Sequence, residues 1–370
     1  MTVGCAGSTR SVPSATNAAQ SALSAPQSTA RGALSDRERQ NDGEPCRARD
    51  GERRSDEDRG EPCRRSLFVA NAGGSTVAQY ALNDLAAPPT VVSNGVSVPV
   101  ALAFDRDGNL FVANTGNNTV TEYPSDHFAA SPTVISNGIS FPDALAVDSQ
   151  GNLYVANSSN NTVTEYRAGH FASPPTVISS GVGGPAALAF DSDGDLFVAN
   201  AANSTVTEYR AGHYAAPTAV ISNGVSFPVA LAFDSDGNLF VANTGNNTVT
   251  EYRSRHYTVV SAVISNGVFF PLALAFAPSG DLFVVNCVVV CGGSGADTVT
   301  EYRSEQYSGS PTVISSGVNN ATSLAFAPSG NLFVANAGNS TVTEYRAGHY
   351  TAVPTVISNG VNSPYAVVVR

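Results

Sequence analysis

The sequence contains no lysine and no tryptophan, and its 19 basic residues other than histidine are all arginines. Charged residues make up 13% of the chain, and the formal net charge is −11. An acidic chain without lysine is a poor electrostatic match for nucleic acid or anionic lipid, so we expect neither as a partner. No apolar run approaches the roughly 18 residues of a transmembrane helix, and no signal peptide is recognisable. We therefore expect no transmembrane segment.

The first 65 residues differ in composition from the rest of the chain. Ser, Ala, Thr and Pro dominate at first, and a dense mixture of Arg, Asp and Glu follows. Such a segment has little to bury, so we predict that residues 1–65 form a disordered tail. A functional tail and an upstream stretch wrongly translated as protein are the alternatives. Residues 66–370 carry the negative charge, with 8 Arg against 20 acidic residues.

A sequence repeat begins directly after this segment. The phrase Leu-Phe-Val-Ala-Asn, or a close variant, recurs at steps of 43 residues, with one step of 50. The repeats start at Leu67, Leu110, Leu153, Leu196, Leu239, Leu282 and Leu332. Each complete unit holds four short runs of strand-forming residues, separated by turns rich in Gly and Asn. Four strands in about 43 residues are typical of one blade of a β-propeller.

The two ends of the repeat array complement each other. Residues 67–98 supply three strands and lack a first strand, whereas Pro364–Arg370 matches a first strand alone. Together they complete a seventh unit, in which the C-terminal strand pairs with the strand that begins at Leu67. An open solenoid would not need complementary half-units. We therefore predict an all-β fold, a closed seven-bladed β-propeller over residues 66–370.

One stretch of the repeat is similar to a known family. The run Gly237-Asn-Leu-Phe-Val-Ala-Asn-Thr-Gly-Asn-Asn-Thr-Val249 resembles an NHL repeat. That family typically has Asp at the position of Asn243 and Arg at the position of Thr248. Seven blades of this length also resemble the propellers of virginiamycin B lyases. The resemblance implies the fold but no single function, since NHL-type propellers include extracellular sensors, protein-binding scaffolds, RNA-binding modules and lyases.

Histidine and acidic side chains are the first candidates for catalysis or metal binding. The histidines all follow the third strand of their unit, at His127, His170, His213, His256 and His349. Because they lie on different blades, we expect no two to converge on one metal or substrate. The repeated Asp-Ser-Asp-Gly-Asn sequence lacks the Gly and Glu spacing of an EF-hand, so we interpret it as a tight turn. We predict no catalytic residue, no metal site and no cofactor, and the residues give no support for a divalent ion in the channel.

Two sets of residues are candidates for ligand binding. An Asn ends the second strand of every unit: Asn71, Asn114, Asn157, Asn200, Asn243, Asn286 and Asn336. These amides either hold the following turn or form a ring that binds polar ligands. The second position of the first strand varies among the units: Val100, Asp143, Ala186, Val229, Leu272, Thr322 and Tyr365. We expect this position at the channel mouth, with Asp143 and Tyr365 as the best candidates for a unique site.

One unit carries seven extra residues around Cys287 and Cys291. A single C-x3-C pair offers too few ligands for a zinc site. The pair forms a local disulfide if the protein is exported, or two thiols if it is not. An exported or cell-surface location fits the first reading. We predict that the insertion extends the loop between the second and third strands.

The near identity of the blades favours a non-enzymatic binding scaffold, because a catalytic site is asymmetric and usually forces some blades to diverge. The Asn-Thr-Gly-Asn-Asn and Ser-Asn-Gly loops lie on one side of the ring, which we predict to be the recognition surface. The partner would be a protein, a polar small molecule or a glycan, bound by a monomer. The alternative is a metal-dependent lyase or lactone hydrolase with its site at the central channel. RNA binding is disfavoured because the units lack basic residues.

Overall fold

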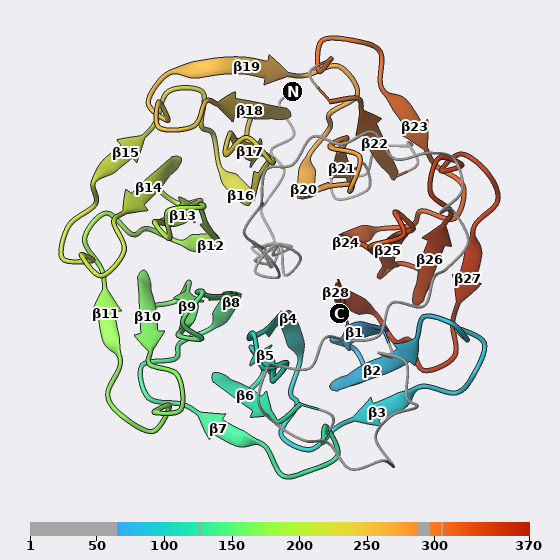
Figure 1. Ribbon diagram of the computed structural model, residues 1–370, viewed down its shortest axis with the longest axis horizontal. Helices are drawn as coiled ribbons and strands as arrows, with labels where there is room; N and C mark the ends of the chain where they lie inside the picture. Colours follow the sequence, from blue (N-terminus) through green and yellow to red (C-terminus); the bar gives the residue numbers. More distant parts are fainter. Residues whose placement is uncertain (1–64, 126, 288–296, 305) are drawn as a thin grey trace, which may run out of the picture.

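The computed structural model describes residues 65–125, 127–287, 297–304 and 306–370. Within these ranges the chain forms seven sheets, each of four antiparallel strands, arranged in a ring around a central axis (Figure 1). The predicted seven-bladed β-propeller is thus confirmed. None of the residues in these ranges belongs to a helix of the length and apolarity that a membrane crossing requires. Residues 1–64, for which disorder is predicted, lie outside the described residues.

Each blade contains an inner, a second, a third and an outer strand, counted from the axis (Figure 1). The inner strands are β4 (Pro99–Phe104), β8 (Pro142–Val147), β12 (Pro185–Phe190), β16 (Pro228–Phe233), β20 (Pro271–Phe276), β24 (Ala321–Phe326) and β28 (Pro364–Val369). The second strands are β1 (Ser66–Asn71), β5 (Leu110–Asn114), β9 (Leu153–Asn157), β13 (Leu196–Asn200), β17 (Leu239–Asn243), β21 (Leu282–Asn286) and β25 (Leu332–Asn336). The third strands are β2 (Thr76–Ala81), β6 (Thr119–Tyr123), β10 (Thr162–Tyr166), β14 (Thr205–Tyr209), β18 (Thr248–Tyr252), β22 (Thr298–Tyr302) and β26 (Thr341–Tyr345). The outer strands are β3 (Thr90–Val92), β7 (Thr133–Ile135), β11 (Thr176–Ile178), β15 (Ala219–Ile221), β19 (Val260–Ile264), β23 (Thr312–Ile314) and β27 (Thr355–Ile357).

The hydrophobic core lies between the blades. Every residue of β4 and β5 is buried, because both faces of these strands are covered by neighbouring blades. Val112 packs in a cluster with Phe68 of the preceding blade, whereas Phe111 packs in a cluster with Leu145 of the following blade. Strands covered on both faces need apolar residues at successive positions. This explains the continuous Ala-Leu-Ala-Phe and Leu-Phe-Val-Ala runs.

A tyrosine at the end of the third strand connects neighbouring blades. The Tyr123 hydroxyl donates to the carbonyl oxygen of Asn94, in the turn after the outer strand of the preceding blade, at 2.5 Å. Tyr80 makes the same contact across the seam of the ring, where its hydroxyl donates to the Asn359 carbonyl oxygen at 2.6 Å. The repeated Thr-Val-Thr-Glu-Tyr sequence therefore carries one blade-to-blade hydrogen bond per unit.

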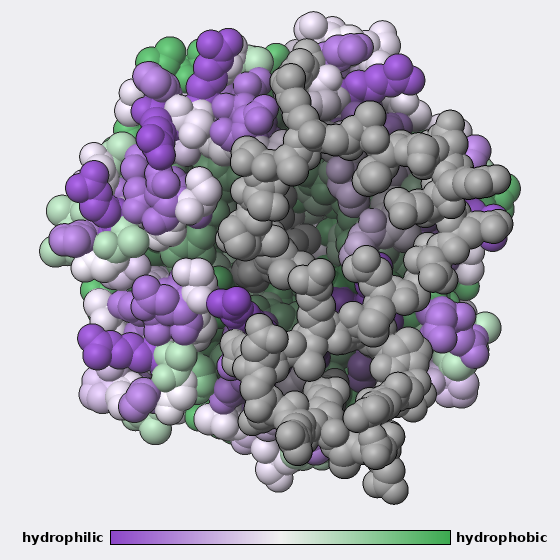
Figure 2. Space-filling model, in the orientation of Figure 1, coloured by the Kyte–Doolittle hydropathy of each residue, from purple (hydrophilic) through white to green (hydrophobic). Residues whose placement is uncertain are grey.

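The outer strands are short, and most have three residues. Each exposes a central valine at the rim, as at Val134 and Val356, which are 56% and 58% exposed. In Figure 2 hydrophobic side chains appear at the outer edge of the ring, and hydrophilic ones cover much of the visible face of the blades. Short edge strands offer little backbone for pairing with another chain.

The ring closes as predicted. β28 pairs with β1 in antiparallel register, with Leu67 opposite Val369 and Val69 opposite Val367. Ser66 and Arg370 exchange two backbone hydrogen bonds of 2.9 Å beyond the end of this ladder. The inner strand β28 also contacts the inner strands β24 and β4 on its two sides. One blade is therefore built from both ends of the repeat array.

Candidate functional site

The turns between the inner and second strands use their acidic side chains internally. Asp105 accepts hydrogen bonds from the Asn109 backbone N–H and from its side-chain amide, both at 2.8 Å. Asp234 and Asn238 repeat the pattern at 2.8 Å. These bonds are those of the predicted tight turn. Over residues 65–125, 127–287, 297–304 and 306–370, no group of three or more His, Cys, Asp or Glu side chains is placed to hold a metal ion.

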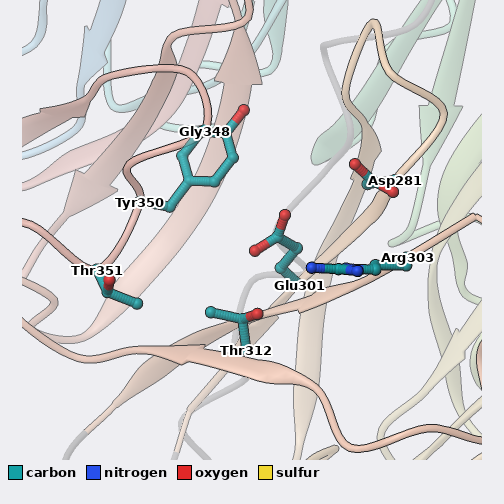
Figure 3. A pocket seen from close by; sticks show the side chains of 7 residues that line it. All are labelled: Asp281, Glu301, Arg303, Thr312, Gly348, Tyr350 and Thr351. Carbon is teal, nitrogen blue, oxygen red and sulfur yellow. The ribbon is translucent and has the colours of Figure 1, made fainter.

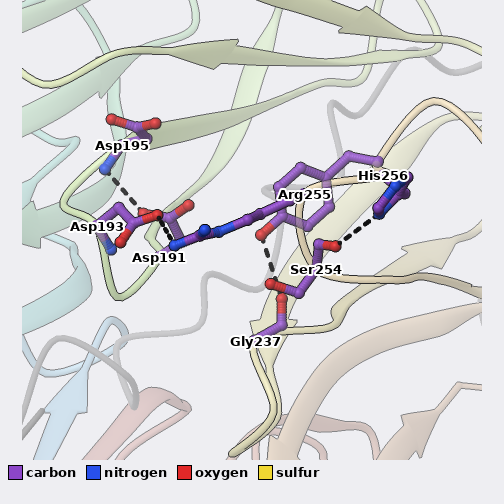
Figure 4. Close-up of polar contacts among 8 residues, drawn as sticks. Asp191, Asp193, Asp195, Gly237, Ser254, Arg255 and His256 are labelled. Atoms are coloured by element: carbon purple, nitrogen blue, oxygen red, sulfur yellow. Dashed lines mark hydrogen bonds and ion pairs between the residues drawn. The ribbon is translucent and has the colours of Figure 1, made fainter.

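The histidines lie on exposed loops between the third and outer strands, as predicted. The Nδ1 atoms of His127 and His170 lie 3.0 and 2.9 Å from carbonyl oxygens two residues earlier in the chain. His256 repeats this turn with the Ser254 carbonyl at 3.1 Å (Figure 4). Beside it, Arg255 forms an ion pair of 3.1 Å with Asp193 of the neighbouring blade. The five histidines thus belong to a repeated loop, each on a different blade.

Grooves between blades open on the face that carries these turns. One groove is lined by Asp281, Glu301, Arg303, Thr312, Gly348, Tyr350 and Thr351 (Figure 3). Burial raises the pKa of Glu301; a hydrogen bond with Thr312 opposes this shift and the charge of Asp281 adds to it. A second groove has Asn109, Glu122, Gly169 and Phe171 at the corresponding positions. Because the groove repeats from blade to blade, its residues follow from the architecture of the repeat.

One blade boundary departs from the repeat, and the sequence did not predict it. The second strands carry Phe at the position where β9 has Tyr154. The hydroxyl oxygens of Tyr154 and Tyr214 lie 2.7 Å apart, and Tyr154 also lies 3.1 Å from Glu165 Oε1. Burial, the contact with Tyr214 and the charges of Glu165 and Asp148 raise the pKa of Tyr154 above its ordinary value.

The opposite face, where the inner strands begin, is called the mouth face below. The Asn that ends each second strand lies here and is almost completely buried. Asn114 Oδ1 accepts from the Ser97 N–H at 3.0 Å, and its Nδ2 donates to the Val112 carbonyl and to Thr121 Oγ1, both at 3.1 Å. The other six asparagines also accept from the loop that leads into the adjoining inner strand. The asparagine ring therefore positions the loops of the mouth face.

The variable second position of the inner strand is a β-bulge in every blade. The strand register shifts between Pro142 and Ala144, so Asp143 is the extra residue in its pairing with β9. The same shift occurs at the equivalent place in the other six blades. A bulge bends the strand and redirects its side chain. Thr322 illustrates this, since its hydroxyl donates at 3.1 Å to the Pro364 carbonyl oxygen of the next inner strand. We call these seven residues the bulge ring.

Asp143 and Tyr365, the two polar candidates from the sequence, are brought together. They lie on β8 and β28, the inner strands on either side of β4. Tyr365 packs against the cluster that contains Val100 of β4 and Leu145 of β8, and Leu145 lies two residues after Asp143. Burial, and then the charge of Asp143, raise the pKa of Tyr365 well above its ordinary value. Asp143 itself is 6% exposed.

The residue before each inner strand has a left-handed backbone. In three blades it is Gly184, Asn320 or Ser363, and Gly and Asn tolerate this conformation well. In the other four it is a bulky hydrophobic residue at a φ of +44° to +52°: Val98, Phe141, Phe227 and Phe270. A loop of the preceding blade stabilises this conformation by a hydrogen bond. For example, Asn118 Oδ1 accepts from the Phe141 N–H at 2.7 Å. Composition and pattern could not predict this conformation for bulky residues.

Two of these four side chains, and one next to a third, are nevertheless exposed on the mouth face. Phe227 is 50% exposed, Val98 is 40% exposed, and Phe269, next to Phe270, is 49% exposed. Strained backbone at a bulky residue costs about 1–3 kcal/mol, and such residues cluster at functional sites. The strained and exposed residues lie directly beside the bulge ring.

The two described ends of the insertion, Cys287 and Asp297, lie on the mouth face. The insertion lies between β21 and β22, the second and third strands of its blade, as predicted. Cys287 is buried, and its Sγ lies 3.8 Å from Asn320 Oδ1. Cys291 lies outside the described residues, so the disulfide between the two cysteines stays a prediction.

Solved structures share the fold. A candidate 6-phosphogluconolactonase from Bacteroides fragilis aligns with a TM-score of 0.66 at 16% identity, over 83% of this chain and 98% of its own. A protein from Lactobacillus plantarum aligns with a TM-score of 0.66 at 15% identity, over 83% and 99%. The virginiamycin B lyase of Staphylococcus aureus aligns with a TM-score of 0.59 at 10% identity, over 72% and 85%. Likeness at these identities concerns the fold alone. No protein-family model and no curated protein matches the chain, so the resemblance to NHL repeats rests on the motif.

Proposed function

We propose that this propeller is a binding module that holds its ligand on the mouth face, around the bulge ring. The observation that carries the proposal is where the blades differ. The second, third and outer strands are nearly the same in every unit, whereas the residues before and after the first residue of the inner strand vary. Pro99 is preceded by Ser-Val and followed by Val. Pro142 is preceded by Ser-Phe and followed by Asp, and Pro271 is preceded by Phe-Phe and followed by Leu.

Packing between blades accounts for only part of the variation at these positions, since Val100, Val229 and Leu272 belong to core clusters whereas Phe227 and Phe269 are exposed. The flanking Pro and Ala residues, buried like the rest of the strand, are the same in six of the seven blades, and β24 has Ala321 and Ser323 instead. The variable positions include the exposed Phe227 and Phe269. Four blades keep a bulky hydrophobic residue at positive φ, where Gly would remove the strain and Asn would reduce it. A ligand that contacts these side chains supplies a reason to keep them.

The mixture of side chains indicates the kind of ligand. Exposed phenylalanine rings supply apolar contact area, and the neighbouring Asn, Ser and Thr loops supply hydrogen-bond donors and acceptors. This combination suits a polar small molecule or a glycan that has one apolar face. A protein partner would use the same surface and is a second outcome of the test.

The test substitutes Phe227→Asn and Phe270→Asn, which place in two blades the residue that Asn320 provides in another. Asn tolerates positive φ, so the relief of strain offsets the packing that Phe270 loses against its core cluster, and we expect an unfolding temperature close to that of the wild type. Wild-type ligands are sought on immobilised oligosaccharides and by thermal shift with polar small molecules, and the double variant should lose them. Asp236→Asn, an exposed change on the other face, is the control. Ligands that survive the double variant but are lost on Tyr154→Phe would place the site elsewhere.

The alternative remains a metal-dependent lyase or lactone hydrolase with its site at the channel, and the names of the structural neighbours favour it. Candidate 6-phosphogluconolactonases from two Bacteroides species and a virginiamycin B lyase share the fold. One lyase structure is described as catalytically inactive after a His-to-Ala change. Turnover of 6-phosphogluconolactone or quinupristin by the purified protein with added Mg²⁺, abolished by Asp143→Asn, would replace the binding proposal with this one.

A further inference from the structure

The bulge ring has one acidic member and no basic member. Asp143 is the acid, and Tyr365 is the neighbouring phenol. The remaining positions are apolar or neutral: Val100, Ala186, Val229, Leu272 and Thr322. A carboxyl group therefore lies in a ring of mainly apolar side chains at the centre of the mouth face.

The surroundings of Asp143 strengthen its attraction for a positive charge. The residue is 6% exposed, and the bulge places it at the beginning of β8. Coulomb attraction grows as water is excluded, because the effective dielectric constant falls. The electrostatic potential of the whole propeller is also negative, because residues 66–370 carry 8 Arg against 20 acidic residues. Such a field raises the local concentration of cations.

Tyr365 supplies the second contact. Its ring packs against the cluster that contains Val100 and Leu145 and remains partly exposed, and burial and then the charge of Asp143 raise its pKa. A phenol oxygen accepts hydrogen bonds from an ammonium or a guanidinium, and an aromatic face attracts the same cations. Asp143 lies on β8 and Tyr365 on β28, on either side of β4, so a ligand that contacts both side chains is oriented across β4.

We propose that Asp143 and Tyr365 form the specificity site of the mouth face and bind an organic cation. The cation is a primary ammonium or guanidinium group on a small apolar body, with the charge at Asp143 and the body against the apolar members of the bulge ring. This inference rests on the proposed binding function and names the class of ligand that the mouth face selects.

The test compares benzylammonium chloride with benzyl alcohol, which has a similar size and shape but no charge. Binding to the full chain is measured by calorimetry and by ligand-observed NMR. The wild-type protein should bind the ammonium at least about tenfold more tightly than the alcohol. Asp143→Asn should remove this preference and leave binding of the alcohol within about twofold of wild type. Tyr365→Phe should weaken binding of the ammonium by a smaller factor.

Two further variants make the result decisive. Asp143→Val introduces the residue that Val100 and Val229 provide at the same bulge, so it should fold and should also lose the preference for the ammonium. Asp236→Asn removes one negative charge from the other face and should leave the preference intact. An undiminished preference in both Asp143 variants would overturn the proposal, as would equal binding of the two probes or no binding at millimolar concentration.

The outcome also separates this inference from the broader function. If both probes bind equally and both are lost in the Phe227→Asn, Phe270→Asn variant, the mouth face is a binding surface without selectivity for cations. If the ammonium depends on Asp143 but not on the phenylalanines, the cation site stands and the wider recognition face does not.

Discussion

The guanidinium carbon of Arg370 lies 5.5 Å from the centre of the Phe104 ring. Arg370 follows the closing strand β28, and Phe104 ends the inner strand of the next blade. Nη2 of Arg370 also donates to Ser125 Oγ at 2.9 Å. A Cβ atom on Gly108, which has a φ of +86°, would lie 2.0 Å from that nitrogen. The absence of a side chain at Gly108 therefore leaves room for Arg370. The Arg370 side chain in turn connects the closing blade to its neighbour through Phe104 and Ser125.

The first prediction concerns this contact. Arg370→Ala removes a cation–π interaction and a side-chain hydrogen bond, and should lower the free energy of unfolding by about 1 kcal/mol. Denaturant titration measures the change. Arg346→Ala, at an exposed arginine in a loop of another blade, should have almost no effect and is the matched control. Equal effects of the two substitutions would show that the contact with Phe104 contributes nothing.

The closing strand as a whole should matter far more. Deletion of Pro364–Arg370 exposes the edge of β1 and removes buried side chains such as Val367 and Val368, each of which contributes about 1.5–3 kcal/mol. We expect a sharply lower unfolding temperature or aggregation. Deleting an equal number of residues from the N-terminus should change little. An unaltered unfolding temperature after the C-terminal deletion would contradict the role assigned to β28.

Alkaline stability should report on the tyrosines between the blades. Burial raises the pKa of Tyr80 and of Tyr252 from 10.0 to about 12. The unfolded chain loses these protons near pH 10 and the folded protein does not. The stability that they contribute is therefore fully present below pH 10 and is lost as the pH rises from about 10 to about 12. Denaturant titrations at stepped pH, followed by phenolate absorbance, measure the decline.

A variant refines this measurement. Tyr80→Phe removes the hydrogen bond to the Asn359 carbonyl and should cost about 1 kcal/mol at neutral pH. It should also make the alkaline decline shallower. A decline that is the same in the variant and in the wild type would assign the pH dependence to other groups.

The inserted loop should be dispensable for folding. Replacing Cys287–Asp297 by Thr-Gly-Asn-Asn restores the connection of the other blades. In the wild type, the Asp297 carboxylate accepts a hydrogen bond from the Asn320 N–H. The last Asn of the replacement would take over this role, just as Asn247 Oδ1 accepts from the Phe270 N–H at 2.8 Å in the preceding blade. We expect a cooperative unfolding transition close to that of the wild type. If the fold is lost, the loop is structural; if only ligand binding is lost, it belongs to the recognition face.

Sequence reasoning succeeded where the repeat itself carries the information. The 43-residue period, the apolar runs and the complementary half-units predicted the blades, the burial of both faces and the pairing of β28 with β1. It also singled out Asp143 and Tyr365, because variation at one position is visible in an otherwise constant unit. Their proximity was not predictable, since it depends on the curvature of the ring and on how a bulge redirects each side chain.

Other features needed the three-dimensional structure for different reasons. The positive φ of Phe227 contradicts the steric preference of a bulky residue and is imposed by the loop of the preceding blade, where Ser204 Oγ accepts from its N–H at 3.1 Å. The contact between Tyr154 and Tyr214 crosses a blade boundary. The asparagines allowed two interpretations from sequence, and the structure places their amides in hydrogen bonds with the protein's own backbone.

The shared blade also constrains how the protein is made. During synthesis β1 leaves the ribosome first, and β28 follows every other strand of the ring. Until then β1 has no partner on its inner side, and the blades of β4 and β24 each lack the inner strand of the blade between them. The nascent chain therefore has to keep two apolar surfaces and one open sheet edge from associating with other chains, the situation in which chaperones are needed. Completion of the ring therefore waits until β28 has been synthesised.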